Sequence, residues 1–384
     1  MRAVLALGLL GAGCGFSVAP SGAADDQPGD GSVDVPVDAC VSFSSQLDTC
    51  GKAGPDTTLS GTLTLNTDSG ELLQGTTPMP ITSAVVATTT NQLEVRAWYV
   101  GILTLAANTQ LRAVGSRPLA IIASGKVTFL MGAVIDVSAG GAGASTACNP
   151  GPTKGSDENG GAAGGGGGGF QGAGAPGGDG NKDGNGSTGG TAGPKLAAMP
   201  AGPLGGCPGA KGGVGGDPGG DGGPGGGAIY IASATEIELL AMAGINAGGG
   251  GGGGGKKQGS QFGDAGGGGG GSGGMIFLEA PRVRSAGTLA ANGGGAGEGS
   301  GNGDAGNPGS PGALSTMRAE GGRGGSSSGS DGGKGSAAAA LDGEGAAAPQ
   351  NGGAGGGGGG AGYVRVRSAD PMLGTGVSPA AITN

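Results

Sequence analysis

The sequence predicts an all-β protein, in which a parallel β-helix carries long glycine-rich inserts that leave it at one corner. Two observations predict this fold: short strand-like segments repeat along the chain, and glycine tracts interrupt the repeat at one equivalent position. A repeat of short strands is typical of a solenoid, because one unit cannot bury its apolar face without its neighbours. An antiparallel β-sandwich with disordered glycine-rich loops is the alternative that the same strands allow.

Three segments align with one another, and a shorter fourth follows: LAIIASGKVTFLMGAVIDVSAGG (119–141), AIYIASATEIELLAMAGINAGG (228–249), MIFLEAPRVRSAGTLAANGG (275–294) and YVRVRSA (363–369). Apolar residues that alternate with polar ones mark half-buried strands. The alignment places Ile122, Ile231, Leu278 and Val366 in one column, Val127, Ile237 and Val283 in a second, and Ile135, Ile245 and Leu289 in a third.

The chain before the first repeat continues the pattern. Alternating segments at Leu93–Trp98, Ile102–Ala106 and Gln110–Val114 predict three more strands. We therefore assign residues 39–92 to an N-terminal β cap with a disulfide loop and residues 93–384 to the β-helix.

The glycine-rich inserts occupy about 139–227, 247–274 and 292–362. Each leaves after the third strand of one repeat and returns before the first strand of the next, so all three should emerge from one corner and lie side by side. Glycine supplies 105 of 384 residues in runs without a three-residue frame, and proline only 22, which excludes collagen.

Two states of the inserts stay open. Glycine loses more conformational freedom on ordering than any other residue, which favours disordered loops. Alternatively, the tracts pack as polyglycine II helices, which have no internal hydrogen bonds and can pair with their neighbours. In composition the tracts are similar to the glycine-helix bundles of snow-flea-type antifreeze proteins and of some phage adhesin tips.

The tract INAGGGGGGGGKKQ (245–258) is not a phosphate-binding loop. Lys257 stands where such a loop needs Ser or Thr, and no helical pattern follows, so no nucleotide partner is expected. Lys256 and Lys257 instead mark the solvated tip of an insert. The stretches GGDGNKDGNGS (177–187) and GGDPGGDGG (215–223) lack the nine-residue period of calcium-binding repeats, which leaves only weak calcium sites open.

Composition argues against catalysis and against nucleic-acid binding. The chain has no histidine, the commonest general base, and its net charge is −9 without basic clusters. We predict no catalytic residue, no cofactor and no metal. The alternatives are an ice-binding protein and a polysaccharide-processing enzyme on a β-helix scaffold. The charged candidates for the enzyme do not share one column: Asp136, Glu238, Glu279, Arg282, Arg284, Arg365 and Arg367. A polar ladder is expected at Asp136, Asn246 and Asn292.

The N-terminus has the features of an export signal. Residues 1–13 combine one basic residue, an apolar stretch and small residues, as in a signal peptide. LGAGC (10–14) resembles the lipobox of bacterial lipoproteins, which implies lipidation of Cys14, and Gly15 implies sorting to the outer membrane. Ordinary cleavage and secretion is the alternative. Residues 14–38 are expected to form a disordered tether.

Four further cysteines, Cys40, Cys50, Cys148 and Cys207, predict two disulfides in an exported chain. We favour Cys40–Cys50 and Cys148–Cys207 among the three pairings. A zinc site would need a closely spaced cysteine pair, which the sequence lacks.

Together these features resemble the glycine-rich predicted lipoproteins that are abundant in myxobacteria and have no assigned activity. The resemblance rests on the lipobox-like end at Cys14 and on ACVSFSSQLDTCG (39–51), NTDSGEL (66–72), RPLAIIASGKVTFLMGAVIDVSAGG (117–141) and AIYIASA (228–234). We expect a non-enzymatic structural or adhesive lipoprotein at the outer membrane or cell surface. Its expected partners are the membrane, through the lipid anchor, and extracellular matrix or glycan.

Overall fold

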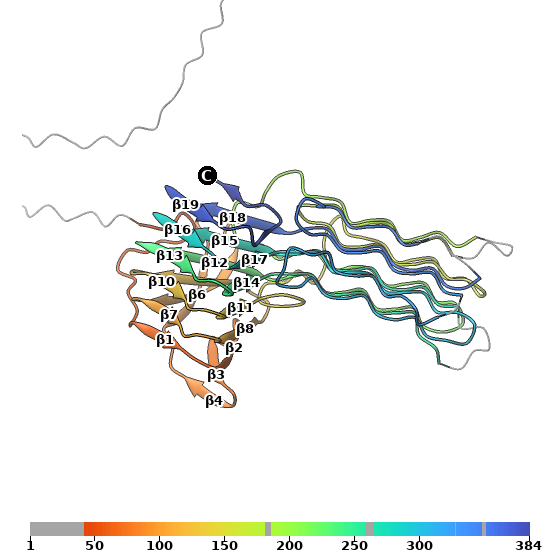
Figure 1. The fold of residues 1–384 in the computed structure, drawn as a ribbon, viewed down its shortest axis with the longest axis horizontal. Helices are drawn as coiled ribbons and strands as arrows, with labels where there is room; N and C mark the ends of the chain where they lie inside the picture. Colours follow the sequence, from red (N-terminus) through yellow and green to blue (C-terminus); the bar gives the residue numbers. More distant parts are fainter. Residues whose placement is uncertain (1–41, 181–185, 259–263, 327, 348–350) are drawn as a thin grey trace, which may run out of the picture. The chain divides into compact units, whose positions relative to one another are not determined.

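The computed structural model describes residues 42–180, 186–258, 264–326, 328–347 and 351–384, which belong to one compact unit, Cys40–Asn384. These residues form β-strands and turns without a helix, so the all-β prediction is confirmed. The strands form three sheets, which we call A, B and C and which together make up the base of the molecule (Figure 1).

Sheet A contains, in spatial order, β1 (Thr57–Leu59), β7 (Leu103–Leu105), β10 (Val127–Phe129), β13 (Glu236–Leu239), β16 (Arg282–Ser285) and β19 (Asp370–Leu373). Sheet B contains β20 (Val377–Ser378), β17 (Thr288–Ala290), β14 (Gly244–Asn246), β11 (Val134–Asp136), β8 (Gln110–Val114), β2 (Thr62–Asn66), β3 (Glu71–Gln74) and β4 (Thr77–Met79). Sheet C contains β21 (Ile382–Thr383), β18 (Tyr363–Arg367), β15 (Met275–Glu279), β12 (Ala228–Ser233), β9 (Leu119–Ala123), β6 (Glu94–Val100) and β5 (Ser83–Ala87).

From β6 onward the chain visits the sheets in the fixed order C, A, B, and each strand pairs in parallel with the strand three places further on. Among the strands of the described residues, antiparallel pairing occurs only in the β2–β3–β4 hairpins and between β5 and β6. Two isolated antiparallel bridges, Gly301 with Asp304 and Ala337 with Ala340, lie in the third insert. The antiparallel sandwich that the sequence left open is therefore not the observed arrangement. Aliphatic side chains from all three sheets meet inside the base in one buried cluster.

The predicted columns of sheets A and B are confirmed. Val127 pairs with Ile237 and Ile237 with Val283, while Ile135 pairs with Ile245 and Ile245 with Leu289.

The predicted column of sheet C is wrong by one residue in the first repeat. Ile231 pairs with Ile121 and not with Ile122. Ile121 belongs to the inner core, whereas Ile122 lies in a second buried cluster on the outer face of sheet C. Because the sheet is buried on both faces, LAII shows no period of two, and nothing in the sequence distinguishes the two registers.

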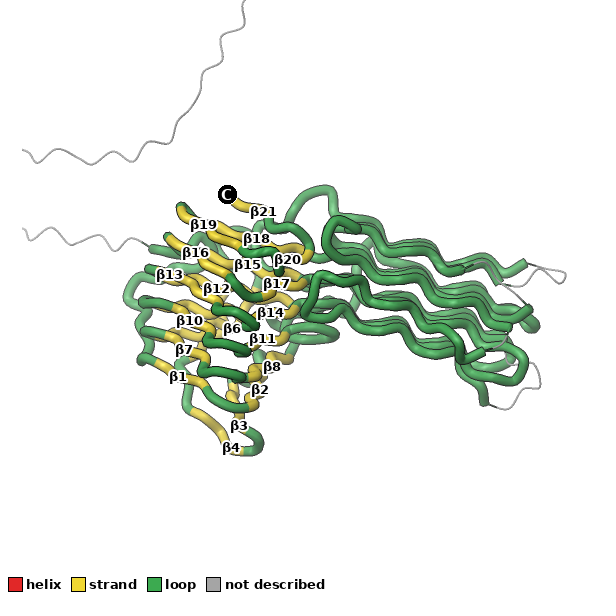
Figure 2. Tube along the Cα trace, in the orientation of Figure 1, coloured by secondary structure: helices red, strands yellow, loops and turns green. Residues whose placement is uncertain are grey.

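The inserts leave and return as predicted: the first connects β11 to β12, the second β14 to β15, and the third β17 to β18. They run side by side in a single glycine arm that extends from the base (Figures 1 and 2). Figure 2 shows no strand or helix in the described residues of the arm. Its order must therefore come from hydrogen bonds between segments.

Segment 264–274, from the second insert, lies at the centre of the arm. Its N–H groups donate to three neighbouring segments in turn, as in Gly266 to Gly213, Gly267 to Ala354 and Gly268 to Gly253, at 2.8–3.0 Å. Three positions further on the same neighbours recur, in Gly269 to Ala210, Gly270 to Gly357 and Gly271 to Gly250. The backbone of this segment thus has a three-residue period.

The carbonyl groups of segment 264–274 accept from three other segments, as in Gly220 to Gly266, Gly165 to Gly267 and Gly297 to Gly268. Six segments therefore surround the central one. Hydrogen bonds also join these six into a closed ring, as in Gly357 to Gly165, Ala210 to Gly166, Gly209 to Gly223, Gly250 to Pro224, Gly252 to Gly295 and Gly356 to Gly297. The ring takes its members from all three inserts, so the arm is one cooperative bundle.

This packing needs residues without a side chain. A Cβ atom on Gly267 would lie 2.1 Å from the carbonyl oxygen of Gly297, and one on Gly270 would lie 2.1 Å from that of Gly294. Both obstacles are backbone atoms, which cannot rotate away as a side chain can. Some positions of the arm do accept a methyl group, as at the fully buried Ala265.

Gly267→Ala and Gly270→Ala should each lower the free energy of unfolding by about 1–3 kcal/mol, because the added methyl group overpacks the bundle. Gly345→Ala is the matched control, since its Cβ would meet nothing nearer than the Pro176 carbonyl oxygen at 3.9 Å. We expect this control to be neutral or more stable by up to about 1 kcal/mol. Chemical denaturation of the three variants measures the difference, and equal losses at all three sites would contradict the packing argument.

Candidate functional site

A group of polar side chains lies on the otherwise mainly apolar outer face of sheet C, beneath residues 42–50, which we call the strap. Leu47 is buried there, and Phe43 packs against the same cluster. The strap is also bonded to the loop after β5, where Thr89 N–H donates to the Gln46 carbonyl at 2.8 Å. Apolar burial and backbone bonds therefore both fix the strap on the sheet.

Glu279, at the end of β15, fastens the strap through its carboxylate. Ser45 donates its N–H to both carboxylate oxygens at 3.1 Å and its hydroxyl to Oε2 at 2.7 Å. The Tyr230 hydroxyl donates to the same Oε2 at 2.5 Å, and Ser44 bonds the Tyr230 oxygen at 2.7 Å. Burial, and secondarily the Glu279 charge, raises the pKa of Tyr230 far above its ordinary value, so its phenol stays neutral.

Two arginines lie beside this carboxylate on β18. Arg367 approaches Glu279 Oε1 at 3.5 Å, and its side chain is 51% exposed. Arg365 stacks over the Phe277 ring at 4.4 Å, and its Nε is buried without a hydrogen-bond partner. Burial, and then repulsion from Arg367, lowers the pKa of Arg365.

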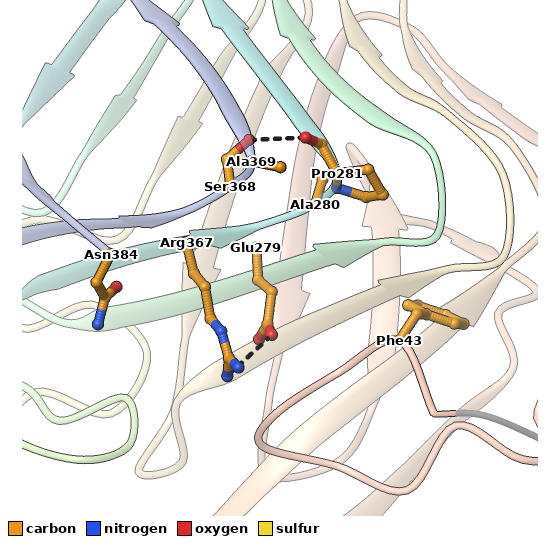
Figure 3. Close-up of a pocket in the computed structure, with 8 residues that line it drawn as sticks. All are labelled: Phe43, Glu279, Ala280, Pro281, Arg367, Ser368, Ala369 and Asn384. Atoms are coloured by element: carbon orange, nitrogen blue, oxygen red, sulfur yellow. Dashed lines mark hydrogen bonds and ion pairs between the residues drawn. The ribbon is translucent and has the colours of Figure 1, made fainter. Parts of the chain in front are cut away.

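A cleft of about 420 Å³ opens next to these groups. Figure 3 shows Glu279 between Arg367 on one side and Phe43 on the other. The remaining lining residues are Ala280, Pro281, Ser368, Ala369 and Asn384. The Ser368 hydroxyl donates to the Pro281 carbonyl at 3.1 Å, which closes the edge of the cleft. Arg367 is thus the most available charged group in the cleft.

A second group of charges covers the outer face of sheet A. Lys126 contacts Glu238 at 2.7 Å and Glu236 at 3.1 Å, and Arg284 lies 3.3 Å from Glu236. The hydrogen bond from Lys126 holds the pKa of Glu236 below its ordinary value of 4.5. These side chains neutralise one another across stacked strands and leave no single reactive group.

The charged candidates predicted from the sequence are distributed over all three sheets, as their lack of a common column suggests. Glu238, Arg282 and Arg284 lie on sheet A, Asp136 on sheet B, and Glu279, Arg365 and Arg367 on sheet C. Glu238 is the cross-strand partner of Arg284 on sheet A, and the last three come together on sheet C. The sequence offered no signal for their partners Tyr230, Ser44 and Ser45, because these contacts join segments far apart in the chain.

The predicted polar ladder on sheet B is only partly correct. Asp136 pairs with Asn246, but the next residue in that column is Ala290 and not Asn292. Asn292 is buried beyond the strand, where its amide donates to the carbonyls of Ala313 and Ser315. Asp136 forms an ion pair with Arg112 at 2.8 Å. The ladder is therefore replaced by contacts that fix the root of the arm.

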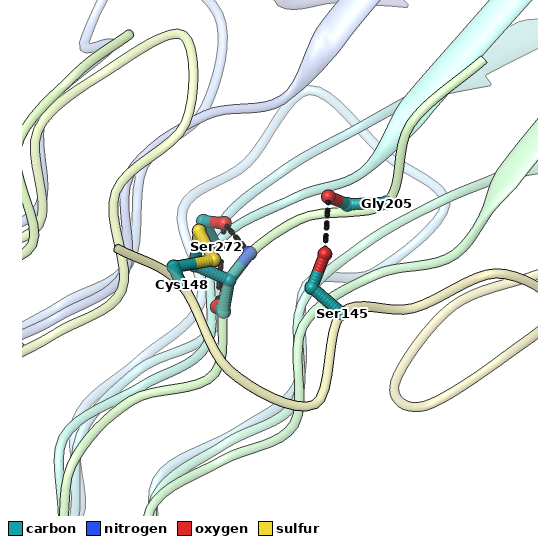
Figure 4. Close-up of a disulfide and its surroundings, with 5 residues drawn as sticks. Ser145, Cys148, Gly205 and Ser272 are labelled. Atoms are coloured by element: carbon teal, nitrogen blue, oxygen red, sulfur yellow. Dashed lines mark hydrogen bonds between the residues drawn. A yellow bond between two sulfur atoms is a disulfide. The ribbon is translucent and has the colours of Figure 1, made fainter. Parts of the chain in front are cut away.

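The predicted disulfide Cys148–Cys207 is present and fastens the first insert near the base (Figure 4). Close by, Cys207 N–H donates to the Ser272 hydroxyl of the second insert at 2.8 Å. Cys50 is also disulfide-bonded. The expected pairing of Cys50 with Cys40 involves a residue outside the described part of the chain, as does the predicted lipidation at Cys14.

The lysine pair of the tract INAGGGGGGGGKKQ (245–258) contacts aspartates of the first insert. Lys256 lies 2.9 Å from Asp221, which also pairs with Lys211, and Lys257 lies 3.9 Å from Asp217. The hydrogen bonds from Lys256 and Lys211 lower the pKa of Asp221. No cluster of three potential metal-ligating side chains occurs within the described residues.

Among the same residues, no helix has the length and apolar character needed to cross a membrane. Comparisons with protein-family models, with curated proteins and with solved structures gave no match.

Replacing Glu279 by Gln should lower the free energy of unfolding by about 1–3 kcal/mol, because the amide presents donors to hydroxyl and N–H groups that need an acceptor. Backbone amides of the strap, Ser45 above all, should exchange faster with deuterium. Glu320→Gln removes a carboxylate whose ion pair with Lys334 is exposed, so it should cost less than about 1 kcal/mol. Unchanged exchange in the strap of Glu279→Gln would contradict the fastening role.

The low pKa of Glu236 predicts a pH dependence of stability. Since its folded-state pKa lies below 4.5, its contribution is complete above that value and is lost as the pH falls through the folded-state pKa. Glu236→Gln should therefore be less stable than the parent at pH 7, and the difference should vanish in acid. Denaturation of both proteins from pH 7 to pH 3 measures this, with Glu71→Gln, an exposed change on β3, as the control. A gap that persists in acid would contradict it.

Proposed function

We infer that the base is a parallel β-helix and that the arm is a bundle of polyglycine II helices. Support for the first comes from the fixed order of the sheets and the parallel pairing of every third strand. Support for the second comes from the three-residue period and from hydrogen bonds that join different segments throughout the arm. In the base similar coils stack on one another, and in the arm similar glycine segments pack side by side.

We propose that the protein is a non-enzymatic structural or adhesive lipoprotein that presents this arm at the cell surface. The observation that carries the proposal is the arm itself, in which the three inserts form one ordered bundle around segment 264–274. Ordering so much glycine is entropically costly. The ordered bundle forms a rigid, extended surface, which is the property that we link to function. Such a surface suits contact with extracellular matrix, glycan or neighbouring cells.

The proposed location follows from the N-terminus. A signal peptide at 1–13 and lipidation at Cys14 would anchor the chain in the outer membrane, with residues 14–38 as the tether. The Cys148–Cys207 disulfide is consistent with an exported, oxidised chain. Secretion without an anchor is the alternative for this step, and palmitate labelling of the parent and of Cys14→Ser distinguishes them.

A non-enzymatic role also agrees with the state of the charged side chains. The carboxylates of Glu236, Glu238 and Glu279 are all engaged by cations or hydroxyls, and sheets A and C place their charged groups on different faces of the base. A general acid and base pair for polysaccharide cleavage would need two free carboxylates that face one substrate. Glu236 and Glu238 share the outer face of sheet A, but Lys126 contacts both.

The function can be tested in cells of the source organism that lack the protein. Cells that express the parent chain or Gly345→Ala should adhere to matrix and to one another, whereas cells with Gly267→Ala and Gly270→Ala combined should adhere several-fold less. Protease treatment of whole cells and immunoblotting confirm that all chains reach the surface in equal amounts. Adhesion that is indifferent to loss of the whole chain would reject an adhesive role, and release of reducing sugars from polysaccharide by purified protein would favour the enzyme.

A further inference from the structure

The cleft on sheet C has the features of a ligand site that is separate from the arm. It lies where the strap crosses the end of β15, and its walls come from the strap, from β18 and from the turns that follow both strands. Its volume of about 420 Å³ falls within the range of small-molecule sites and suits one or two sugar rings.

Arg367 supplies a positive charge to the cleft itself, while Arg365 lies near it on β18 without lining the cleft. The Tyr230 phenol that bonds Glu279 is neutral. One half-exposed guanidinium matches a single carboxylate from outside better than it matches a phosphate dianion.

Arg367 keeps the capacity to bind an anion although it lies beside Glu279. The Glu279 oxygens already accept four shorter bonds of 2.5–3.1 Å from Ser45 and Tyr230, while Arg367 remains at 3.5 Å and half exposed. A planar guanidinium in this state can still donate two parallel bonds to a carboxylate from outside. The Phe43 ring, on the opposite side of Glu279 in Figure 3, offers the apolar surface that a sugar ring needs.

We propose that this cleft binds a hexuronic-acid unit of an acidic polysaccharide, with the sugar carboxylate on Arg367 and the ring against Phe43. The site goes beyond the proposed function, because it would bind a specific sugar at the base and needs nothing from the arm. Together the two would give the protein one broad contact surface and one selective contact.

The proposal is tested by calorimetric titration of the purified complete chain with trigalacturonic acid, galactotriose and inorganic phosphate. Trigalacturonic acid should bind at least tenfold more tightly than the other two. Arg367→Ala should weaken that binding at least tenfold, while Arg367→Lys, which keeps the charge and loses the planar fork, should weaken it less. Arg323→Ala removes a matched exposed charge from the arm and should change the affinity less than twofold.

A second variant tests the site independently, in case Arg367→Ala loses binding through a folding defect. Ala369 is exposed and lines the cleft, so Ala369→Trp should fill the site without disturbing Glu279, and should abolish binding at an unchanged thermal midpoint. Binding of trigalacturonic acid that survives Ala369→Trp overturns the proposal, as does equal affinity for galactotriose or phosphate. Retention of full affinity in Arg367→Ala does so too.

Discussion

The structure depends on one constraint: the buried backbone N–H and C=O groups of the arm must find partners on other segments, because an extended three-residue helix can form no hydrogen bond within itself. That requirement brings segments so close that the carbonyl oxygen of Gly297 would lie 2.1 Å from any Cβ at position 267. Glycine at such positions is therefore a steric necessity. The base is under a similar constraint, because the backbone N–H and C=O groups of its strands bond to strands of the coils above and below.

The base supplies the apolar core that the glycine bundle lacks. Glycine segments bury little apolar surface, and their conformational entropy opposes ordering. The aliphatic core of the three sheets fixes both ends of every insert at adjacent coils, so segments that would otherwise diffuse freely begin and end next to their partners. Cys148–Cys207 shortens the longest of these excursions at its root. The strap, fastened by Glu279, covers the one outer sheet face that is rich in aromatic and aliphatic side chains.

How much of this could be predicted from the sequence differs between regions, for physical reasons. The strand Gln110–Val114 and the columns through Ile237 and Ile245 were predictable because one side of those sheets is polar. Ile122 was misplaced because sheet C is apolar on both sides. The exit point of the inserts follows from their position in the repeat, but the order of segments in the arm does not, since one run of glycine is like another. Glu279 could be named from its charge alone, yet its partners Ser45 and Tyr230 lie in remote segments.

The position of segment 264–274 at the centre of the arm has a consequence for how the chain matures. Its six neighbours come from the first, second and third inserts, and the last of them, 351–362, ends just before β18. During synthesis the central segment therefore has an incomplete shell of partners until almost the whole chain is present. The arm must assemble late and around its middle, after the coils of the base have brought the three inserts into register.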